Sequence, residues 1–489
     1  MTLLRAQETS PVDEGREAGR TPRDPVAHAV RWLVPHALLA GMFLLMARLA
    51  ATPLDNTDTY FHLRFGREFL DGGWSLRDPG SVSSFGSADW VPTQWLPQLA
   101  MAQLEDWFGL AGVAWLSGLQ FVTLAVTFFV VARRRADPVI AVPVVMVALC
   151  ASAAGMSMRP QVLSYILVAV TTAVWLRAAQ TGRAPWILVP LTWVWAMCHG
   201  MWPVGIVIGA AVVLGTCLDR RSATGLRLAV VPALSAVAAC LTPVGPRLVD
   251  AVLTVSSRGA YFSEWGSPVF TELNTIALLG MLAAATVIAI RRGSTWVEIL
   301  LIGLAAAWTV YSLRTVPVAA AMLVPLLATG AQRLVGPRSP VLRAERGWVA
   351  AAVIAAIAVL TVQVPHAADR PPAELRSVDG LLADLPSGTK VLSDTGDGGY
   401  LMWRFPELDL MTHGYGDTFT TAELDRNATI AGLESGWVDV LRDSDVAYAA
   451  LEPSSDLAYA LRELAGWRVV NESSSWELLE PPSDWDALP

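Results

Sequence analysis

The residues best suited to chemistry lie in one short polar segment, Asp55 to Glu68, which follows the first long apolar run. A helix beginning at Asp58 would place His62 one turn later on the same side. The phenylalanines of this segment would form an apolar stripe lying on a bilayer: Phe61, Phe65 and Phe69. The segment is therefore predicted to be an interfacial helix with one acidic, histidine-bearing face. A carboxylate there can act as a general base toward a hydroxyl group.

Other ionisable residues stand at the ends of apolar runs: Arg159, His199, Arg247, Glu264 and Arg314. Such residues mark functional sites in membrane proteins, because their placement costs free energy. Mg²⁺ and Mn²⁺ take oxygen ligands, usually one or two carboxylates together with substrate phosphate. Asp58 and Glu264 are therefore candidate metal ligands. Arg159 and Arg314 could hold a phosphate or diphosphate through charge-assisted hydrogen bonds.

Each of these residues also has a plainer interpretation. Asp55 and Asp58 could merely cap the interfacial helix. His199, beside a helix break, could be a hydrogen-bonded structural residue. The two arginines could extend toward lipid headgroups, and Glu264 could be a solvated loop carboxylate. Convergence of several such residues on one side of a membrane carries more weight than any single one.

The composition places most of the chain in lipid. It has 489 residues, of which 54% are hydrophobic and 16% charged, and its mean hydropathy is +0.45. Soluble proteins carry about 25% charged residues, which argues against a soluble enzyme and against a disordered scaffold. The formal net charge of −8 argues against a nucleic-acid partner. The four cysteines form no CxxC pair, which argues against a zinc site.

About eleven apolar runs could cross a bilayer as helices. They are residues 32–51, 110–132, 138–156, 161–178, 185–199, 203–218, 228–246, 273–290, 295–313, 316–332 and 348–364. Arginines fill every second connection, as the positive-inside rule expects. This predicts a multi-pass protein of the plasma (inner) membrane with a disordered cytoplasmic segment 1–30 and a transmembrane domain 31–364. The first outer loop, 52–109, and residues 365–489 would lie outside the cytoplasm.

Residues 365–489 are predicted to form a small extracytoplasmic α/β domain, because helix-like and strand-like stretches alternate. The helix-like stretches are Pro372–Leu385, Thr420–Leu433 and Ser455–Gly466. The strand-like stretches are Lys390–Ser393, Leu408–Thr412, Val446–Leu451, Trp467–Asn471 and Trp476–Leu479. His413 to Gly416 reads first as a turn, and Asp394, Asp397 and Asp417 read as ordinary loop residues.

The segment from Asp58 to Arg64 resembles the Asp-Pro-Tyr-Tyr-His-Leu-Arg segment of oligosaccharyltransferase catalytic subunits, which are integral-membrane glycosyltransferases of the GT-C fold. A closer resemblance is to a broad group of bacterial GT-C-type membrane proteins, whose loop reads roughly Asp-x-Asp-x-Trp-Trp-His-Leu-x-x-Gly. Here that loop corresponds to Asp55 through Gly66. Further similar stretches are Asp78-Pro79, Trp90 to Trp95, Arg159 to Gln161, Trp195 to Gly200, Thr242 to Gly245, Glu264 to Pro268 and Gly398 to Trp403.

This resemblance implies a GT-C glycosyltransferase that moves a sugar from a polyprenyl-phosphate-linked donor to a cell-envelope glycan, lipid or protein on the outer face. Asp58, with Asp55 as its neighbour, would bind metal or act as the catalytic carboxylate. The residues expected to contact substrate are Tyr60, His62, Arg64, Arg159, His199 and Arg314. The aromatic pair before the histidine is Tyr-Phe instead of Trp-Trp, and the tail has no Trp-Trp-Asp motif, which argues against protein N-glycosylation.

Two other classes of function remain open. A transporter or flippase of a lipid-linked substrate would place ionisable residues near the bilayer midplane and often has inverted repeats; neither feature is visible here. A non-catalytic GT-C-like scaffold would act through its outer tail. A requirement for Mg²⁺ or Mn²⁺ also stays open, because arginines alone could serve a monophosphate donor. The sugar, the acceptor and the inverting or retaining outcome are not encoded in any recognisable motif.

Overall fold

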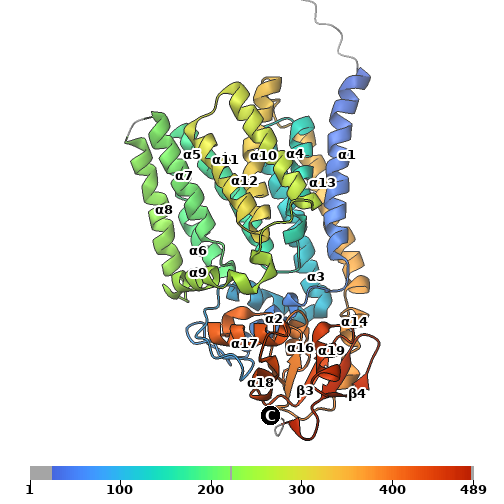
Figure 1. Cartoon of the computed structure of the whole chain (residues 1–489). Helices are drawn as coiled ribbons and strands as arrows, with labels where there is room; N and C mark the ends of the chain where they lie inside the picture. The colour runs from blue at the N-terminus through green and yellow to red at the C-terminus, as the bar shows by residue number, and fades with distance from the viewer. Residues whose placement is uncertain (1–24, 221–222, 486–489) are drawn as a thin grey trace, which may run out of the picture.

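Long apolar helices form one half of the molecule, and a region containing a β-sheet forms the other (Figure 1). The structure is a computed structural model and describes residues 25–220 and 223–485. Its apolar helices are α1 (Pro25–Ala50), α3 (Trp95–Arg133), α4 (Pro138–Ser152), α5 (Gln161–Thr181), α6 (Leu188–Cys198), α7 (Pro203–Arg220), α8 (Thr224–Cys240), α10 (Leu273–Arg292), α11 (Trp296–Tyr311), α12 (Val316–Val335) and α13 (Arg343–Ala367).

Each predicted span overlaps one of these helices, and the chain is membrane-embedded. Among the described residues, seven helical stretches are long and apolar enough to cross a bilayer, and they belong to α1, α3, α4, α5, α10, α12 and α13. The other four apolar helices, α6, α7, α8 and α11, have 11–18 residues, less than the roughly 20 that a bilayer requires. A count of eleven crossings therefore stays a prediction.

Two helix boundaries differ from the predicted ones. Helix α1 already begins at Pro25, inside the segment predicted to be disordered; residues 1–24 of that segment lie outside the described residues. Helix α3 begins at Trp95, inside the predicted outer loop, and is broken at Gly109, which has a φ of 62°. Since only glycine adopts such a φ readily, Gly109 separates an outer helical segment from the predicted span.

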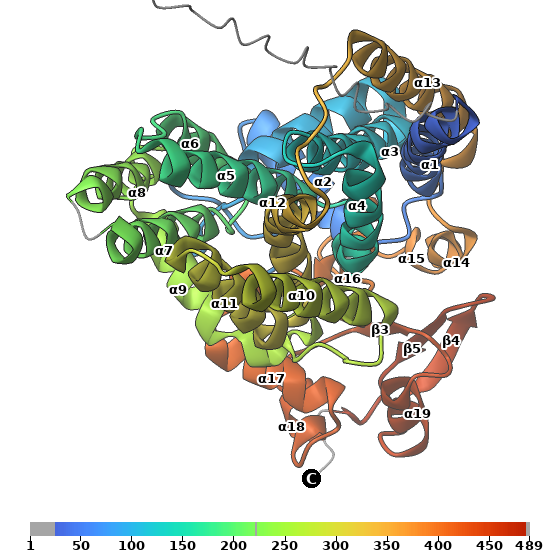
Figure 2. The ribbon, with the colours of Figure 1, turned by 90° about the horizontal axis from the view of Figure 1, so that it is seen from above.

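Helix α12 lies in the middle of the bundle (Figure 2). Its residues from Val316 to Ala328 are all buried, as expected for a helix that is apolar on every side. The short 3-10 helix η4 (Leu313–Thr315) precedes it. This central helix thereby fixes the position of Arg314.

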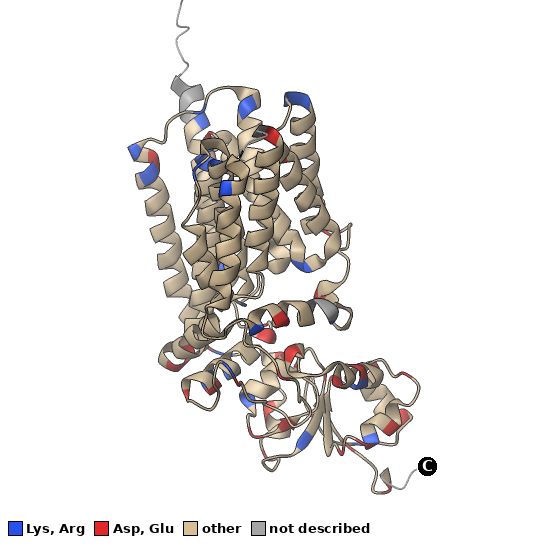
Figure 3. Cartoon of the chain, turned by 90° about the vertical axis from the view of Figure 1, so that its left-hand side faces the viewer, with Lys and Arg blue, Asp and Glu red and all other residues tan. Residues whose placement is uncertain are grey.

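Basic residues gather at the end of the bundle that lies away from the sheet (Figure 3). The last turns of α3, α10 and α12 contain Arg133, Arg291, Arg292 and Arg333. Figure 3 shows acidic and basic residues mixed in the region that contains the sheet. This asymmetry is the one that the positive-inside rule uses to assign an orientation.

The sheet has five strands in the order β2-β1-β3-β5-β4. Its strands are β1 (Lys390–Ser393), β2 (Asp409–Leu410), β3 (Tyr448–Leu451), β4 (Arg468–Glu472) and β5 (Glu477–Glu480). The helices of this region are α14 (Ala373–Arg376), α15 (Asp379–Leu382), α16 (Gly398–Arg404), α17 (Thr421–Ala431), α18 (Trp437–Arg442) and α19 (Asp456–Glu463). Each predicted strand is thus present. Because β1 pairs in parallel with β2 and β3, the loops that follow β1 and β2 open at the same sheet edge.

Helix α2 (Asp58–Leu70) begins where the sequence predicted and lies between the bundle and the sheet region (Figure 1). The predicted exposure of its phenylalanine stripe to lipid is wrong. Phe61 and Phe65 are buried and pack against Tyr415, with ring centroids 4.9 and 4.7 Å apart. Trp90 is buried in the same aromatic cluster. The sheet region covers this face of α2 in place of lipid.

Contacts from α16 hold the sheet region on α2. The ring of Tyr60 packs against Tyr400 and Trp403, at centroid distances of 5.2 and 5.1 Å. The indole Nε1 of Trp403 donates a hydrogen bond to Glu105 Oε1 at 2.7 Å. A Cβ built on Gly399 would lie 2.3 Å from the carbonyl oxygen of Thr57, so only glycine permits this approach.

Candidate active site

A cavity of about 480 Å³ lies between the helix bundle and the sheet region. One wall comes from α2 and from helix ends of the bundle, and the facing wall comes from the loops after β1 and β2. Helix α9 (Arg247–Ser257) and the 3-10 helices η2 (Gly259–Tyr261) and η3 (Ser263–Trp265) form a third side. The ionisable residues along it are Asp58, His62, Arg159, His199, Arg258, Tyr261, Glu264, Arg314, Tyr415 and Asp417.

Arg159 joins the two carboxylates that the sequence singled out. Its Nη1 donates to Asp58 Oδ2 at 2.6 Å, and its Nη2 donates to Glu264 Oε1 at 2.5 Å. Its Nε donates to the hydroxyl of Ser157 at 2.8 Å. The Arg159 side chain is only 11% exposed. All three donor nitrogens of this guanidinium are therefore engaged.

Local sequence explains why these groups point into the cavity. The Asn56 side chain accepts a hydrogen bond from the backbone N–H of Asp58 at 3.0 Å. Asn56, and not Asp55, thus satisfies a free N–H at the start of α2, which leaves the Asp58 carboxylate to Arg159. Arg159 precedes Pro160, with which the turn into α5 begins, and Glu264 lies within η3.

The environment shifts the two carboxyl groups in opposite directions. Burial raises the pKa of Asp58 above its ordinary value, although Arg159 acts against that shift. Burial would also raise the pKa of Glu264, but the Arg159 and Arg314 charges outweigh it and lower that pKa below its usual range. Asp58 is therefore more basic than an ordinary aspartate, and Glu264 is less basic than an ordinary glutamate.

Two further arginines border the cavity. Arg314 Nη1 lies 3.8 Å from Glu264 Oε2, and the Arg314 guanidinium sits 5.4 Å from the centre of the Trp265 ring. Its Nε is buried and has no hydrogen-bond partner among the described residues. Arg258 Nη1 donates to the carbonyl oxygen of Gly416 at 3.4 Å. Arg314 thus keeps donors available for an anionic group.

Both histidines of the cavity are held by polar neighbours. Nδ1 of His62 lies 3.0 Å from the Gln98 side-chain nitrogen, and Nδ1 of His199 lies 3.0 Å from the Ser164 hydroxyl. Burial lowers the pKa of His62 well below its ordinary value, and the nearby arginines add to the shift. The His62 ring is therefore neutral near pH 7.

Three residues that the sequence predicted for the site do not reach the cavity. Asp55 is exposed and precedes α2. Tyr60 is fully buried, and its hydroxyl donates to the carbonyl oxygen of Leu54 at 2.7 Å. Arg64 pairs with Glu68 at 2.8 Å on another face of α2. The structure brings the other predicted residues together at the cavity: Asp58, His62, Arg159, His199, Glu264 and Arg314.

Several lining residues were missed by sequence reasoning. Arg258 and Tyr261 were not singled out, and Asp417 was interpreted as an ordinary loop residue. Asp417 lines the cavity together with Gly414, in the loop after β2. The alternating glycines from His413 to Gly416 were the available signal, because glycine permits close approach of a backbone. A Cβ on Gly414 would indeed lie 3.2 Å from Asp58 Oδ1.

The predicted divalent cation can be tested against these contacts. The described residues contain no group of three or more His, Cys, Asp or Glu side chains placed to hold a metal ion. Asp58 and Glu264 instead share the Arg159 guanidinium. A divalent cation needs several oxygen ligands, and the position between these two carboxylates is occupied by an arginine. This donor set does not fit a divalent metal ion.

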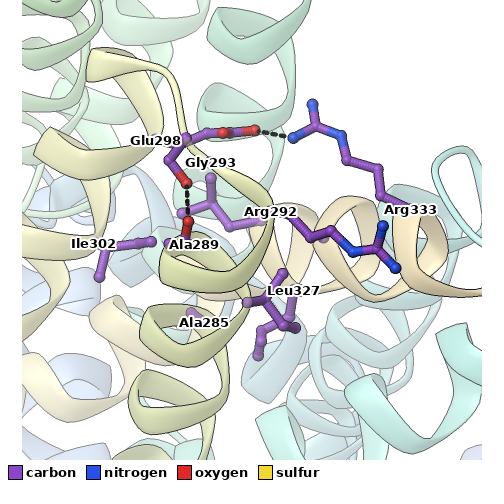
Figure 4. A pocket seen from close by; sticks show the side chains of 12 residues that line it. Ala285, Ala289, Arg292, Gly293, Glu298, Ile302, Leu327 and Arg333 are labelled. Atoms are coloured by element: carbon purple, nitrogen blue, oxygen red, sulfur yellow. Dashed lines mark hydrogen bonds and ion pairs between the residues drawn. The ribbon is translucent and has the colours of Figure 1, made fainter.

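A second pocket, of about 30 Å³, lies where α10, α11 and α12 meet (Figure 4). Arg333 Nη1 pairs there with Glu298 Oε1 at 2.8 Å, and Arg292 lines the same pocket. Its small volume and self-paired charges leave no room for a sugar-sized substrate. The larger cavity is the candidate active site.

Solved structures resemble this fold along nearly the whole chain. The archaeal oligosaccharyltransferase AglB from Archaeoglobus fulgidus, in complex with an inhibitory peptide and a dolichol-phosphate, aligns with a TM-score of 0.57 and 12% identity, covering 93% of this chain and 75% of AglB. ArnT from Cupriavidus metallidurans in the apo state aligns with a TM-score of 0.51 and 15% identity, covering 94% of this chain and 100% of ArnT.

Its complex with undecaprenyl phosphate aligns with a TM-score of 0.50, 15% identity and the same coverage of both chains. Neither protein-family models nor curated protein sequences match this chain. The solved structures are GT-C glycosyltransferases, and the chain has the GT-C fold.

Proposed function

We propose that this protein is a membrane glycosyltransferase that transfers a sugar from a polyprenyl-phosphate-linked donor to a hydroxyl-bearing acceptor of the cell envelope, a glycan or a lipid. The observation that carries the proposal is the placement of Asp58 in one cavity with Arg314 and Arg258. This cavity offers a proton acceptor together with cations suited to a phosphate leaving group.

Asp58 is the proposed general base. Its carboxylate takes the proton of the acceptor hydroxyl while the acceptor oxygen forms a bond to the anomeric carbon. The bond between the anomeric carbon and the phosphate oxygen breaks, and polyprenyl phosphate leaves with the electron pair. The raised pKa of Asp58 makes it a stronger proton acceptor than an ordinary aspartate.

The arginines are proposed to stabilise the departing phosphate. Charge builds on the phosphate oxygen as the glycosidic carbon–oxygen bond breaks, and preorganised donors lower the free energy of that transition state. Arg314 is suited to this role, because its Nε is unpartnered among the described residues and its contact with Glu264 is long. Arg258 lines the same cavity.

The sheet region is proposed to contact the acceptor. Thr395 and Asp417 line the cavity from the loops after β1 and β2, opposite the bundle from which a lipid-linked donor would approach. Their hydroxyl and carboxylate oxygens can hydrogen-bond to sugar hydroxyls. The acceptor would thus enter from the aqueous side, with Asp58 between it and the donor.

The similar structures support the donor class. The AglB structure contains dolichol-phosphate, and one ArnT structure contains undecaprenyl phosphate. Both ligands are polyprenyl phosphates, and the GT-C fold is shared with this chain. With the arginine-rich helix ends facing the cytoplasm, the cavity and the sheet region lie on the outer face of the plasma membrane.

Mass spectrometry of the lipids retained by the purified protein tests this proposal, with Asp58→Asn beside wild type. We expect polyprenyl phosphate or its glycosylated form in both samples, and accumulation of the glycosylated form in the variant. Asp55→Asn is the matched control, because Asp55 lies outside the cavity. Retention of ordinary phospholipids alone, or equal sugar transfer by wild type and Asp58→Asn, would contradict the proposal.

A further inference from the structure

We propose that Arg159 supplies the positive charge between Asp58 and Glu264, so that the site works without a divalent cation. The inference concerns the site of the proposed function, and its activity test assumes that function. Its metal-binding test does not depend on that function. The observation behind it is that one guanidinium donates to both carboxylates, at 2.6 and 2.5 Å.

The geometry places the guanidinium where a bridging cation would have to sit. Two nitrogens of one planar group each serve a different carboxylate, which is the forked donor arrangement that distinguishes arginine from lysine. The third nitrogen donates to Ser157 at 2.8 Å. Because all three nitrogens are engaged and the side chain is 11% exposed, displacement of Arg159 would leave a mostly buried cation without partners.

The requirements of the metal point the same way. Mg²⁺ favours six oxygen ligands in octahedral geometry and usually combines one or two carboxylates with water and substrate phosphate. To gain the carboxylates it would have to break two charge-assisted hydrogen bonds, which are about twice as strong as neutral ones. An arginine keeps its charge throughout the accessible pH range, so the Asp58–Glu264 pair is compensated before any substrate binds.

The role of Arg159 is to position Asp58. Held from one side by Nη1, the carboxylate keeps its second oxygen, Oδ1, for the acceptor. Glu264 holds the other end of the guanidinium and fixes its plane. Arg159 therefore acts through Asp58, while Arg314 and Arg258 remain available for the phosphate.

Binding of Mn²⁺ to the full chain in detergent, followed by electron paramagnetic resonance, gives the first test. We expect wild type to bind no Mn²⁺ that depends on Asp58, so that wild type and Asp58→Asn have equal signals. Arg159→Gln frees the two carboxylates and should gain Mn²⁺ binding, which Arg159→Gln with Asp58→Asn should lose. One equivalent of Mn²⁺ on wild type that is lost in Asp58→Asn would overturn the inference, as would equal binding by wild type and Arg159→Gln.

Sugar transfer in the presence of EDTA gives the second test. We expect the wild-type rate to be unchanged by EDTA and by added Mg²⁺ or Mn²⁺. A rate that falls in EDTA and is restored by either cation would overturn the inference and leave the proposed glycosyltransferase intact. Absence of transfer under every condition would count against the proposed function instead, and the Mn²⁺ measurement would still decide the role of Arg159.

Discussion

Arg159 Nη1 lies 2.6 Å from Asp58 Oδ2, although the two residues are 101 positions apart in the chain. The same guanidinium reaches Glu264, a further 105 positions along. One side chain thereby holds together three segments that lie far apart in the chain. This ion-pair triad connects α2, the turn before α5 and η3, and all three of its residues line the cavity.

Removal of the Arg159 guanidinium, which both carboxylates share, should destabilise the fold. We expect Arg159→Ala to lower the free energy of unfolding by about 3 kcal/mol, because Asp58 loses its partner and Glu264 keeps only the long contact with Arg314. Unfolding in mixed detergent micelles measures the change. Arg370→Ala is the control, since its ion pair with Asp369 is exposed and such pairs contribute about 0–1 kcal/mol. Equal stability of the two variants would show that the triad does not stabilise the fold.

Loss of Arg314 should weaken donor binding. Arg314→Ala removes donors that face the proposed phosphate, and a hydrogen bond to a charged group contributes about 2 kcal/mol. We therefore expect roughly a 30-fold rise in the dissociation constant for polyprenyl phosphate, measured by titration calorimetry in detergent. Arg333→Ala, at the pocket formed by α10, α11 and α12, should bind polyprenyl phosphate as wild type does. If Arg314→Ala and Arg333→Ala bind polyprenyl phosphate with the same affinity, Arg314 does not bind the phosphate.

The pKa of His62 predicts that stability falls in acid. Burial holds the pKa of His62 well below its ordinary value in the folded protein, whereas the unfolded chain titrates near pH 6.5. Below that pH the unfolded state binds the extra proton, so stability is complete above about pH 6.5 and is lost as the pH falls.

At pH 5 we expect His62 to account for a loss of about 2 kcal/mol relative to pH 7. Thermal unfolding of wild type and His62→Gln across this range measures it. The variant should show a shallower dependence on pH, because glutamine does not titrate. Parallel curves would mean that His62 is already protonated in the folded protein, or that it is hydrated.

The approach of α16 to α2 should not tolerate a side chain at Gly399. Gly399→Ala would bring a Cβ to 2.3 Å from the Thr57 carbonyl oxygen, which must push the sheet region away from α2. Overpacking of this kind costs about 1–3 kcal/mol. We expect faster limited proteolysis within residues 365–489 and reduced sugar transfer.

Gly380→Ala is the matched control for this test. A Cβ at Gly380 meets nothing within 4 Å, and the residue lies in α15 of the same region. Proteolysis and transfer rates of this variant should equal those of wild type. If Gly399→Ala behaves like Gly380→Ala, close docking of α16 on α2 is not needed for the site.

Local sequence predicted the elements well, because each signal is contained within a few turns. The start of α2 at Asp58 follows from polar residues before an apolar stripe, and Lys390–Ser393 is the strand β1 that its pattern predicts. Helix α16, from Gly398 to Arg404, was not predicted as a helix. Its two leading glycines have poor intrinsic helix propensity, and packing against α2 overrides that preference.

The faces of α2 could be read from the sequence only in part. His62 follows Asp58 by four residues, so both face the cavity, as the helical period predicts. Arg64 follows Asp58 by six residues, which turns it to another face, where it meets Glu68. The sequence of a helix does not show whether one of its faces contacts lipid or protein. An apolar stripe of phenylalanines is compatible with both, and here Phe61 packs on Tyr415.

The sequence by itself determined a membrane protein with a long apolar bundle, a helix that begins at Asp58, and a small sheet region. These features follow from hydropathy and periodicity, which depend only on residues close together in the sequence. Only the tertiary structure decided which polar residues share the cavity. Arg159, Glu264 and Asp417 come from three distant segments, and their convergence depends on how the bundle and the sheet pack, because no local pattern encodes contacts between residues so far apart in the chain.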